Sequence, residues 1–496
     1  MKRISLCVLL FFPLITQLVH AELPATVLGA LKAEHVPLDS VSVFAQLVDE
    51  AKPSIAHNAD APMNPASVMK LITSYAALDL LGPAYRWQTN FYSIEAIKNN
   101  TLNSGLWVKP SGDPSLNKGN LAEITSAIRQ RYGLREICCE LVIDNSVYAP
   151  IVFDTSAFDN QPFRSYNAPA EPLMVNQQAV RLQFIPPAVS LDGEQKDTKV
   201  ITVAYPNWAG LHIKTDVKVS TIDCIDWKSQ LFFKREADVF SITGNYPASC
   251  GEKYIDLYWM NGAEYFSRLF VSAWQSAGGI WSQSACLKNN SCAAQITTQT
   301  HRQTPPQLRF ASLPSTATLL YQHTSPALAD VLRDMNKTSN NVIARALYLA
   351  LSATDHQPAS IEKSEQVIKN WLASKHLNYS ELVLENGAGL SRKERISAAH
   401  LAELLVSAYH SPIMPELMAS LPVLGVDGTL EKRKDNLASG RAHLKSGSLD
   451  NVRAIAGYVL DNQSRRWVVV FIANGAKAAN TKPAQQALLD WVTTHP

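Results

Sequence analysis

A serine and a lysine three residues apart, Ser67 and Lys70, stand at the start of a long apolar segment. Asn64 and Pro65 before them favour a helix N-terminus, and Gly82 would end a helix of about 17 residues that is apolar on nearly every face. Because helix positions i and i+3 share one face, the hydroxyl and the amine would be neighbours. A lysine removed from water loses proton affinity, and a serine beside such a base can become a nucleophile.

The Ser-x-x-Lys pattern is weak evidence by itself, because the chain contains it three times. Ser115 and Lys118 lie in a polar loop, and Ser360 and Lys363 lie on a charged helix face. A solvated pair explains both of these copies. Only the first copy opens a segment that is apolar enough to be buried.

Two other short motifs strengthen the first one. Ser339 and Asn341 form Ser-x-Asn at the start of an expected helix, where an ordinary N-cap is the alternative. Lys445, Ser446 and Gly447 form the one Lys-[Ser/Thr]-Gly of the chain, where a surface turn is the alternative. The three motifs in this order are the signature of acyl-serine enzymes of the penicillin-binding and β-lactamase type.

With these motifs the chain resembles the class C low-molecular-mass penicillin-binding proteins, the D-alanyl-D-alanine carboxypeptidase/endopeptidase family. The long interval between Ser67 and Ser339 is typical of that family, whereas class A β-lactamases have a much shorter one. Further similar stretches are residues 111–116, 166–169, 385–392 and 421–430. The resemblance implies an α/β (α+β) fold, in which a transpeptidase/β-lactamase-like body with an antiparallel sheet flanked by helices is interrupted by inserted β-rich domains.

The resemblance also implies a role for the first two motifs. Ser67 would attack the carbonyl carbon between two D-alanines, or between D-alanine and the next cross-linked residue. Lys70 would accept the proton of the serine. Ser339 would relay protons to the departing amine, and Asn341 would orient the substrate amide and Lys70.

The third motif would bind the end of the substrate. Lys445 and Ser446 would hold the terminal carboxylate, and the charge of Lys445 would lower the proton affinity of Lys70. Gly447 and Ser448 complete this strand, and the backbone N–H groups of Ser67 and Ser448 would form the oxyanion hole. Ser446 stands where threonine is commoner in the family, but the hydroxyl is kept.

Many family members also carry an acidic residue, shortly before a Tyr-x-Ala stretch, that recognises the free amine of diaminopimelate. The corresponding segment here, residues 158–164, is shorter and lacks the usual tryptophan-rich context. Asp159 is the nearest candidate for this substrate-binding role. The alternative is that Asp159 is only a turn residue.

The length of 496 residues allows two to four domains, and the formal net charge of +2 gives no argument for a nucleic-acid partner. The expected catalytic domain is split into residues 22–90 and 305–496. Residues 91–304 would be inserted, with a β-rich part at about 180–262. Two apolar runs close to the C-terminus, 454–460 and 467–473, predict an antiparallel hairpin.

Residues 1–21 have the basic start, the apolar run and the small-residue cleavage site of a signal peptide. They predict export to the periplasm, and an uncleaved anchor is the alternative. Removal of Cys7 leaves six cysteines, an even number that favours disulfides in an exported protein. Six cysteines allow fifteen pairings, of which Cys224–Cys250 and Cys286–Cys292 are the local ones.

The predicted function is that of a serine D,D-carboxypeptidase and D,D-endopeptidase that acts on peptidoglycan stem peptides without a cofactor or metal. β-Lactam antibiotics would be acylating inhibitors. A serine β-lactamase is one alternative, but no glutamate-bearing water loop can be identified. A catalytically idle wall-binding protein is another, and the presence of all the motif side chains counts against it. The sequence leaves the oligomeric state open.

Overall fold

The computed structural model describes residues 22–495 except 139, 188–198, 209, 237–238, 283–305 and 355–356. The predicted signal peptide and the predicted Cys286–Cys292 pair lie outside the described residues. Within the described part of the chain, no helix is both long and apolar enough to cross a membrane.

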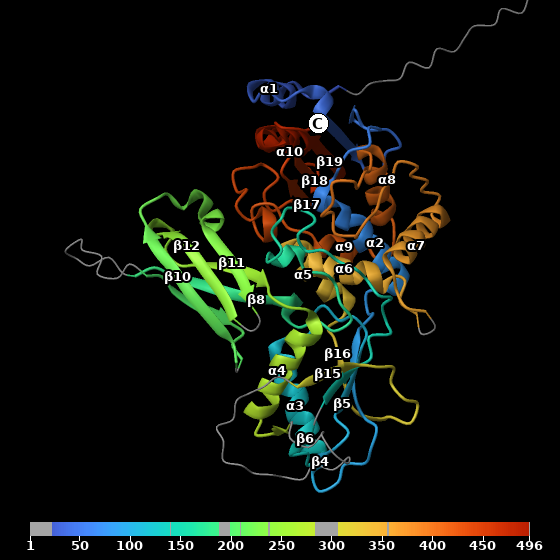
Figure 1. Cartoon of the computed structure of the whole chain (residues 1–496). Coiled ribbons are helices and arrows are strands. Elements are labelled where there is room, and N and C mark those ends of the chain that lie inside the picture. The colour runs from blue at the N-terminus through green and yellow to red at the C-terminus, as the bar shows by residue number, and fades with distance from the viewer. Residues whose placement is uncertain are drawn as a thin grey trace, which may run out of the picture.

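A five-stranded antiparallel sheet with the strand order β17-β18-β19-β1-β2 lies at the centre of one part of the molecule (Figure 1). Strands β18 and β19 pair directly, which confirms the hairpin predicted near the C-terminus. Residues 467–473 of β19 are all buried, as expected for a central strand that is covered on both faces. The strands are β1 Val41–Leu47, β2 Ile55–His57, β17 Ala442–Leu449, β18 Val452–Leu460 and β19 Arg466–Asn474.

Helices cover both faces of this sheet (Figure 1). Because side chains alternate along a strand, Val469 and Phe471 pack with helices α1 and α10, whereas Val468 and Val470 pack with the larger helical layer on the other face. The first layer contains α1 Ala25–Ala33 and α10 Lys482–Thr494. The second contains α2 Lys70–Leu81, α5 Leu328–Thr338, α6 Asn341–Ala350, α7 Ile361–Ser374, α8 Ala398–Tyr409 and α9 Met414–Ser420. The predicted antiparallel sheet flanked by helices is therefore confirmed.

The apolar segment around Ser67 is buried and ends at Gly82, as predicted, but it does not form one continuous helix. It begins with a 3₁₀ turn, η2 Ala66–Met69, and the α-helix α2 starts only at Lys70. The side chain of Asn64 accepts a hydrogen bond from the backbone N–H of Ala66 at 2.9 Å, and Ala66 has a φ of 48°. This tight turn replaces the predicted first helical turn.

The chain leaves this body after α2 and forms a large insertion (Figure 1). One unit of it is the sheet β15-β7-β5-β3-β16 with a short sheet β14-β6-β4, packed with helices α3 and α4. Strands β15 and β16 pair with β7 and β3, so the strand pairing of the insertion continues to Thr324, beyond the boundary predicted at residue 305. The elements are β3 Gln88–Ser93, β4 Thr101–Leu102, β5 Leu106–Pro110, α3 Lys118–Tyr132, β6 Glu136–Cys138, β7 Glu140–Ile143, α4 Gly262–Ser276, β14 Ile280–Ser282, β15 Gln307–Phe310 and β16 Thr318–Thr324.

The second unit of the insertion consists of the sheets β13-β8-β9 and β10-β12-β11, which lie to one side of the body in Figure 1. Its strands are β8 Ala179–Ile185, β9 Ile201–Tyr205, β10 His212–Ser220, β11 Leu231–Glu236, β12 Val239–Pro247 and β13 Lys253–Tyr258.

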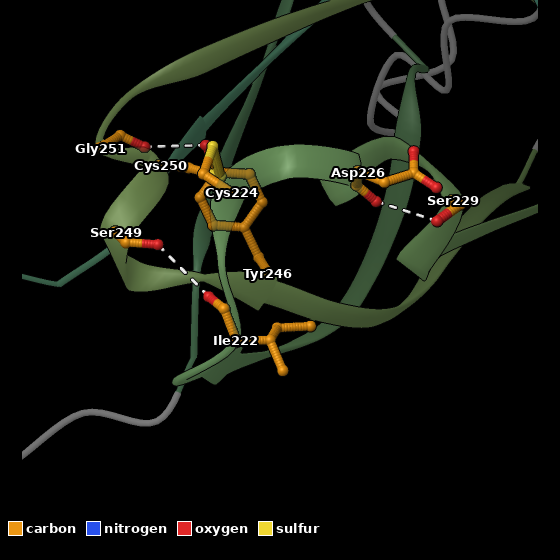
Figure 2. Close-up of a disulfide and its surroundings, with 8 residues drawn as sticks. All are labelled: Ile222, Cys224, Asp226, Ser229, Tyr246, Ser249, Cys250 and Gly251. Atoms are coloured by element: carbon orange, nitrogen blue, oxygen red, sulfur yellow. Dashed lines mark hydrogen bonds between the residues drawn. A yellow bond between two sulfur atoms is a disulfide. The ribbon is translucent and has the colours of Figure 1, made fainter. Parts of the chain in front are cut away.

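A disulfide joins Cys224 and Cys250 at one end of this unit, which confirms the local pairing predicted for these two cysteines (Figure 2). Around it, the hydroxyl of Tyr246 donates a hydrogen bond to the carbonyl of Gly251 at 2.8 Å. The bridge closes a segment with a sequence separation of 26 residues and therefore restricts the unfolded chain.

Candidate active site

The three predicted motifs meet in the body of the molecule. Lys70 Nζ donates hydrogen bonds to Ser67 Oγ at 3.1 Å and to Asn341 Oδ1 at 2.7 Å. Lys445 Nζ donates to Ser339 Oγ at 2.8 Å. The tertiary structure therefore brings Ser67 and Lys70, which precede the insertion in sequence, into one polar cluster with residues that follow it. These residues are Ser339 and Lys445.

Ser67 lies on the 3₁₀ turn η2, which packs directly against strand β17. A Cβ atom added to Gly447 on that strand would lie 2.5 Å from the carbonyl oxygen of Pro65 and 3.1 Å from the backbone nitrogen of Ser67. Contacts as short as these exclude any side chain larger than hydrogen at Gly447. The glycine of the third motif is therefore required for the turn that carries Ser67 to reach the edge strand.

Ser339 and Asn341 lie at the junction of two helices. Helix α5 ends at Thr338, Ser339 has a φ of 58°, and α6 begins at Asn341. The residue between them, Asn340, is the N-cap, and its side chain accepts from the backbone N–H of Ile343 at 3.0 Å. The alternative role of an ordinary N-cap thus falls to Asn340, and the side chains of Ser339 and Asn341 are left for the site.

Both lysines of the site are buried to 0% exposure. Burial, and then the like charges of Lys445 and Arg345, hold the pKa of Lys70 well below its ordinary value. Burial also lowers the pKa of Lys445 to about 7. An amine in this environment is more readily neutral than an exposed lysine, and in its neutral form Lys70 can accept the proton of the Ser67 hydroxyl.

Strand β17 forms the edge of the sheet beside Ser67. Lys445 Nζ donates to the carbonyl of Ser446 at 2.9 Å, and the hydroxyl of Ser446 lies 2.8 Å from the hydroxyl of Thr429. Ser448 is exposed two residues farther along the strand. An edge strand can bind an extended peptide along its length, and hydroxyls beside a lysine can bind a carboxylate end.

The contacts among the three motifs agree with the protein family that the sequence matches. Residues 25–306 and 302–495 match the family described as D-Ala-D-Ala carboxypeptidase 3 (S13). The chain belongs to this family of serine-type carboxypeptidases. The match covers both chain segments that form the body around the five-stranded sheet, and the insertion between them.

Relatives of this S13 chain extend over most of its length. It is 22% identical over 444 residues to the D-alanyl-D-alanine carboxypeptidase DacB of Haemophilus influenzae, which covers 88% of this chain and 85% of the relative. It is 25% identical over 454 residues to the penicillin-sensitive carboxypeptidase A of Dictyostelium discoideum, which covers 84% of this chain and 79% of the relative.

The fold is that of a solved member of the penicillin-binding proteins. The crystal structure of penicillin binding protein 4 from H. influenzae superposes with a TM-score of 0.75 at 20% sequence identity, and the match covers 95% of this chain and 100% of that one. The predicted transpeptidase/β-lactamase-like architecture with inserted domains is therefore confirmed.

Asp159 of this S13 chain lies in a turn that is linked to the motif cluster. Its carboxylate accepts hydrogen bonds from the hydroxyl of Tyr166 at 2.7 Å, from Asn167 Nδ2 at 2.8 Å and from the backbone N–H of Gln161 at 3.1 Å. The carbonyl of Tyr166 in turn accepts from Asn341 Nδ2 at 3.3 Å. The carboxylate thus has a local turn role and a connection to the site through Tyr166.

The other two Ser-x-x-Lys pairs have local structural roles. Ser360 is the N-cap of α7, and its side chain accepts from the backbone N–H of Lys363 at 3.2 Å. Ser115 Oγ donates to Asp113 Oδ1 at 2.6 Å. Among the residues that the structure describes, no group of three His, Cys, Asp or Glu side chains could hold a metal ion.

The segment of residues 385–396 contributes contacts that the motifs do not reveal. The backbone carbonyl of Ala388 accepts a hydrogen bond from Lys70 Nζ. Gly389 lies so close to the turn that carries Ser67 that an added Cβ would be 2.0 Å from the carbonyl oxygen of Ala66. Two buried charged residues, Arg345 and Glu394, also act on the pKa of Lys70. No sequence signal marks either one, since charged residues usually lie in solvent.

Proposed function

We propose that this carboxypeptidase removes terminal D-alanine from peptidoglycan stem peptides and also cleaves D-Ala–diaminopimelate cross-links, through an acyl-enzyme on Ser67. The observation that carries the proposal is the contact of 3.1 Å between Ser67 Oγ and the amine of Lys70, a group that burial deprives of proton affinity. A serine beside a neutral base can attack an amide carbonyl.

In the acylation step, Ser67 Oγ gives its proton to the neutral amine of Lys70 and bonds to the carbonyl carbon of the penultimate D-alanine. The backbone N–H groups of Ser67 and Ser448 would stabilise the oxyanion. Ser339, which accepts a hydrogen bond from Lys445, would relay the proton that Lys70 took up to the amine that leaves when the C–N bond breaks, so that Ser339 keeps its hydroxyl and Lys70 is neutral again. Water then cleaves the ester and releases the shortened peptide.

The substrate end would lie along strand β17. The charge of Lys445 and the hydroxyl of Ser446, which is paired with Thr429, suit a terminal carboxylate. Asn341, which shares Lys70 with Ser67, would bind the substrate amide. A β-lactam has the same carboxylate and a strained amide, so it would acylate Ser67 and block the site.

We also propose that the protein works in the periplasm after its signal peptide, residues 1–21, is removed. The pattern of those residues supports export. The disulfide between Cys224 and Cys250 supports it independently, because such bonds persist in oxidising compartments.

Incubation with benzylpenicillin tests the nucleophile. We expect the intact protein to gain the mass of one penicillin and to keep it, and we expect Ser67→Ala to gain none. Digestion of purified cross-linked muropeptides, with products identified by mass, then reports both peptidase activities. Rapid loss of the adduct would favour a β-lactamase instead. A Ser67→Ala protein that replaces the wild type fully in cells would favour an idle wall-binding protein.

Asp159→Ala tests recognition of diaminopimelate. We expect cleavage of diaminopimelate-bearing peptides to fall about tenfold, the worth of one charge-assisted hydrogen bond, while cleavage of simple D-Ala-D-Ala peptides changes little. Tyr166→Phe is the control, because it removes the hydroxyl bonded to Asp159 but keeps the carboxylate. Equal losses on both peptides would mean that Asp159 only shapes the turn.

A further inference from the structure

One buried carboxyl group beneath the active site has no part in the steps above. Glu394 has 0% exposure and lies in the segment that follows Gly389. Isolated β-bridges on its C-terminal side hold the segment in place: Arg395 pairs with Val383, and Ile396 pairs with Met63, in the loop that leads to the turn carrying Ser67. The backbone around Glu394 is therefore fixed against the same turn that carries Ser67.

One oxygen of this carboxyl group organises the loop that contacts Lys70. Glu394 Oε1 accepts hydrogen bonds from the backbone N–H groups of Glu385 at 3.2 Å and Asn386 at 3.3 Å. The side chain of Asn386 accepts from the N–H of Ala388 at 2.9 Å, and the carbonyl of Ala388 accepts from Lys70 Nζ. A continuous chain of hydrogen bonds thus runs from Glu394 to the proposed base.

The second oxygen supplies charge rather than a hydrogen bond. Among the described residues, Glu394 Oε2 is buried without a hydrogen-bond partner. Three basic side chains, Lys70, Lys445 and Arg345, are buried in the same region, at 0%, 0% and 6% exposure. A buried cluster of like charges is costly, and a buried carboxylate nearby offsets part of that cost.

We propose that Glu394 is a positioning residue that holds the Ala388 carbonyl against Lys70 and balances the buried cations, so that Lys70 takes up and releases its proton within the working pH range. The inference rests on the proposed role of Lys70 as the base. It assigns to Glu394 two separable effects, one on geometry and one on charge.

The charges around Lys70 predict the direction of the second effect. The carboxylate of Glu394 raises the pKa of Lys70, whereas burial, Lys445 and Arg345 lower it. Burial raises the pKa of Glu394 itself to about 7, and the neighbouring Glu385 adds to this, while Lys70 opposes it. The carboxylate also acts on Arg345, whose pKa burial lowers to about 10 while Glu394 opposes this, and on the hydroxyl of Tyr348, whose pKa is raised mainly by burial.

The test is the pH dependence of the acylation rate with benzylpenicillin. Glu394→Gln keeps an oxygen for the two backbone N–H groups but removes the charge, so the pKa of Lys70 should fall and the acid limb of the profile should move to lower pH. Because the pKa of Glu394 is about 7, its charge acts on Lys70 mainly above that pH, and on that part of the acid limb we expect the variant to retain roughly threefold more of its maximal rate than the wild type does. Glu394→Ala, which also removes the loop anchor, should lower the maximal rate about tenfold.

Arg345→Gln should move the acid limb of the pH profile in the opposite direction. This test can be made whether or not the Glu394 variants fold. Removal of this cation should raise the pKa of Lys70 and move the acid limb to higher pH. Glu171→Gln is the matched control, because Glu171 is another carboxyl group whose pKa burial raises to about 7, and its charge acts on Tyr258. We expect its acid limb to coincide with that of the wild type.

The outcomes separate this inference from the proposed function. A wild-type protein that penicillin does not acylate would overturn the function itself. If the wild type is acylated but folded Glu394→Gln has an unchanged acid limb, the inference about Glu394 is wrong. A shift of the Arg345→Gln limb to lower pH would also overturn it, since it would reverse the sign required by the charges.

Discussion

Lys70→Arg is expected to lower the rate of penicillin acylation about 10³-fold, because removal of a general base typically costs two to four orders of magnitude. Arginine keeps the positive charge and the donors, but it remains protonated at any working pH and cannot accept the proton of Ser67. Raising the pH should therefore not restore the activity of this variant. Quench-flow acylation with intact-mass detection measures the effect.

The pair Ser360 and Lys363, which has the same Ser-x-x-Lys spacing, provides a matched control. Lys363→Arg makes the same replacement at an exposed position behind Ser360, and it should leave the rate unchanged. Because Lys70 is buried, Lys70→Gln serves as a second variant that lacks a basic atom and adds no bulk. A folded Lys70→Arg or Lys70→Gln protein with more than about a tenth of the wild-type rate would contradict the assignment of the base.

Gly389→Ala should also reduce acylation strongly, about 100-fold, although Gly389 contacts no substrate in the proposed mechanism. An added Cβ would lie 2.0 Å from the carbonyl oxygen of Ala66 and 2.8 Å from the Cα atom of Ser67, so the nucleophile turn must move. A displacement of about 1 Å can cost two orders of magnitude in rate, because the attack geometry is lost.

Gly440→Ala separates this effect from backbone strain. Gly440 has a φ of 74°, close to the 80° of Gly389, but an added Cβ would have no heavy atom within 4 Å. Both variants should lose about 1 kcal/mol of stability because alanine disfavours positive φ. Thermal unfolding and acylation measured side by side give the comparison. Equal acylation rates in the two variants would show that the turn adapts without loss of function.

The sequence was most informative where a signal is local. The spacing of Ser67 and Lys70, the apolar helix behind them and the C-terminal hairpin were all predicted from short segments. The structure differs at the first turn, since the Asn64 side chain and the positive φ of Ala66 produce a 3₁₀ turn. That turn depends on packing against Gly389 and Gly447, which come from remote parts of the chain.

The recognition of the two remote motifs depended on residue types in a fixed order, not on any predicted contact. The folded structure shows that these motifs lie beside Ser67. Lys70 Nζ is 2.7 Å from Asn341 Oδ1, although the two residues are 271 positions apart in the sequence. Strands β15 and β16 show the opposite case. They follow the predicted domain boundary in sequence, yet their partners β7 and β3 assign them to the insertion.

The amino-acid sequence alone predicts the reacting groups, a serine and two lysines, and the family of carboxypeptidases, because residue types and helix periodicity can be read from neighbouring positions. The burial of several charged residues in one region becomes evident only in the folded structure. Glu394 lies between Lys393 and Arg395 and is typical in sequence of a solvated charged run, but folding removes it completely from water. Burial arises from contacts between distant segments, and it is burial that shifts the pKa values on which the site depends.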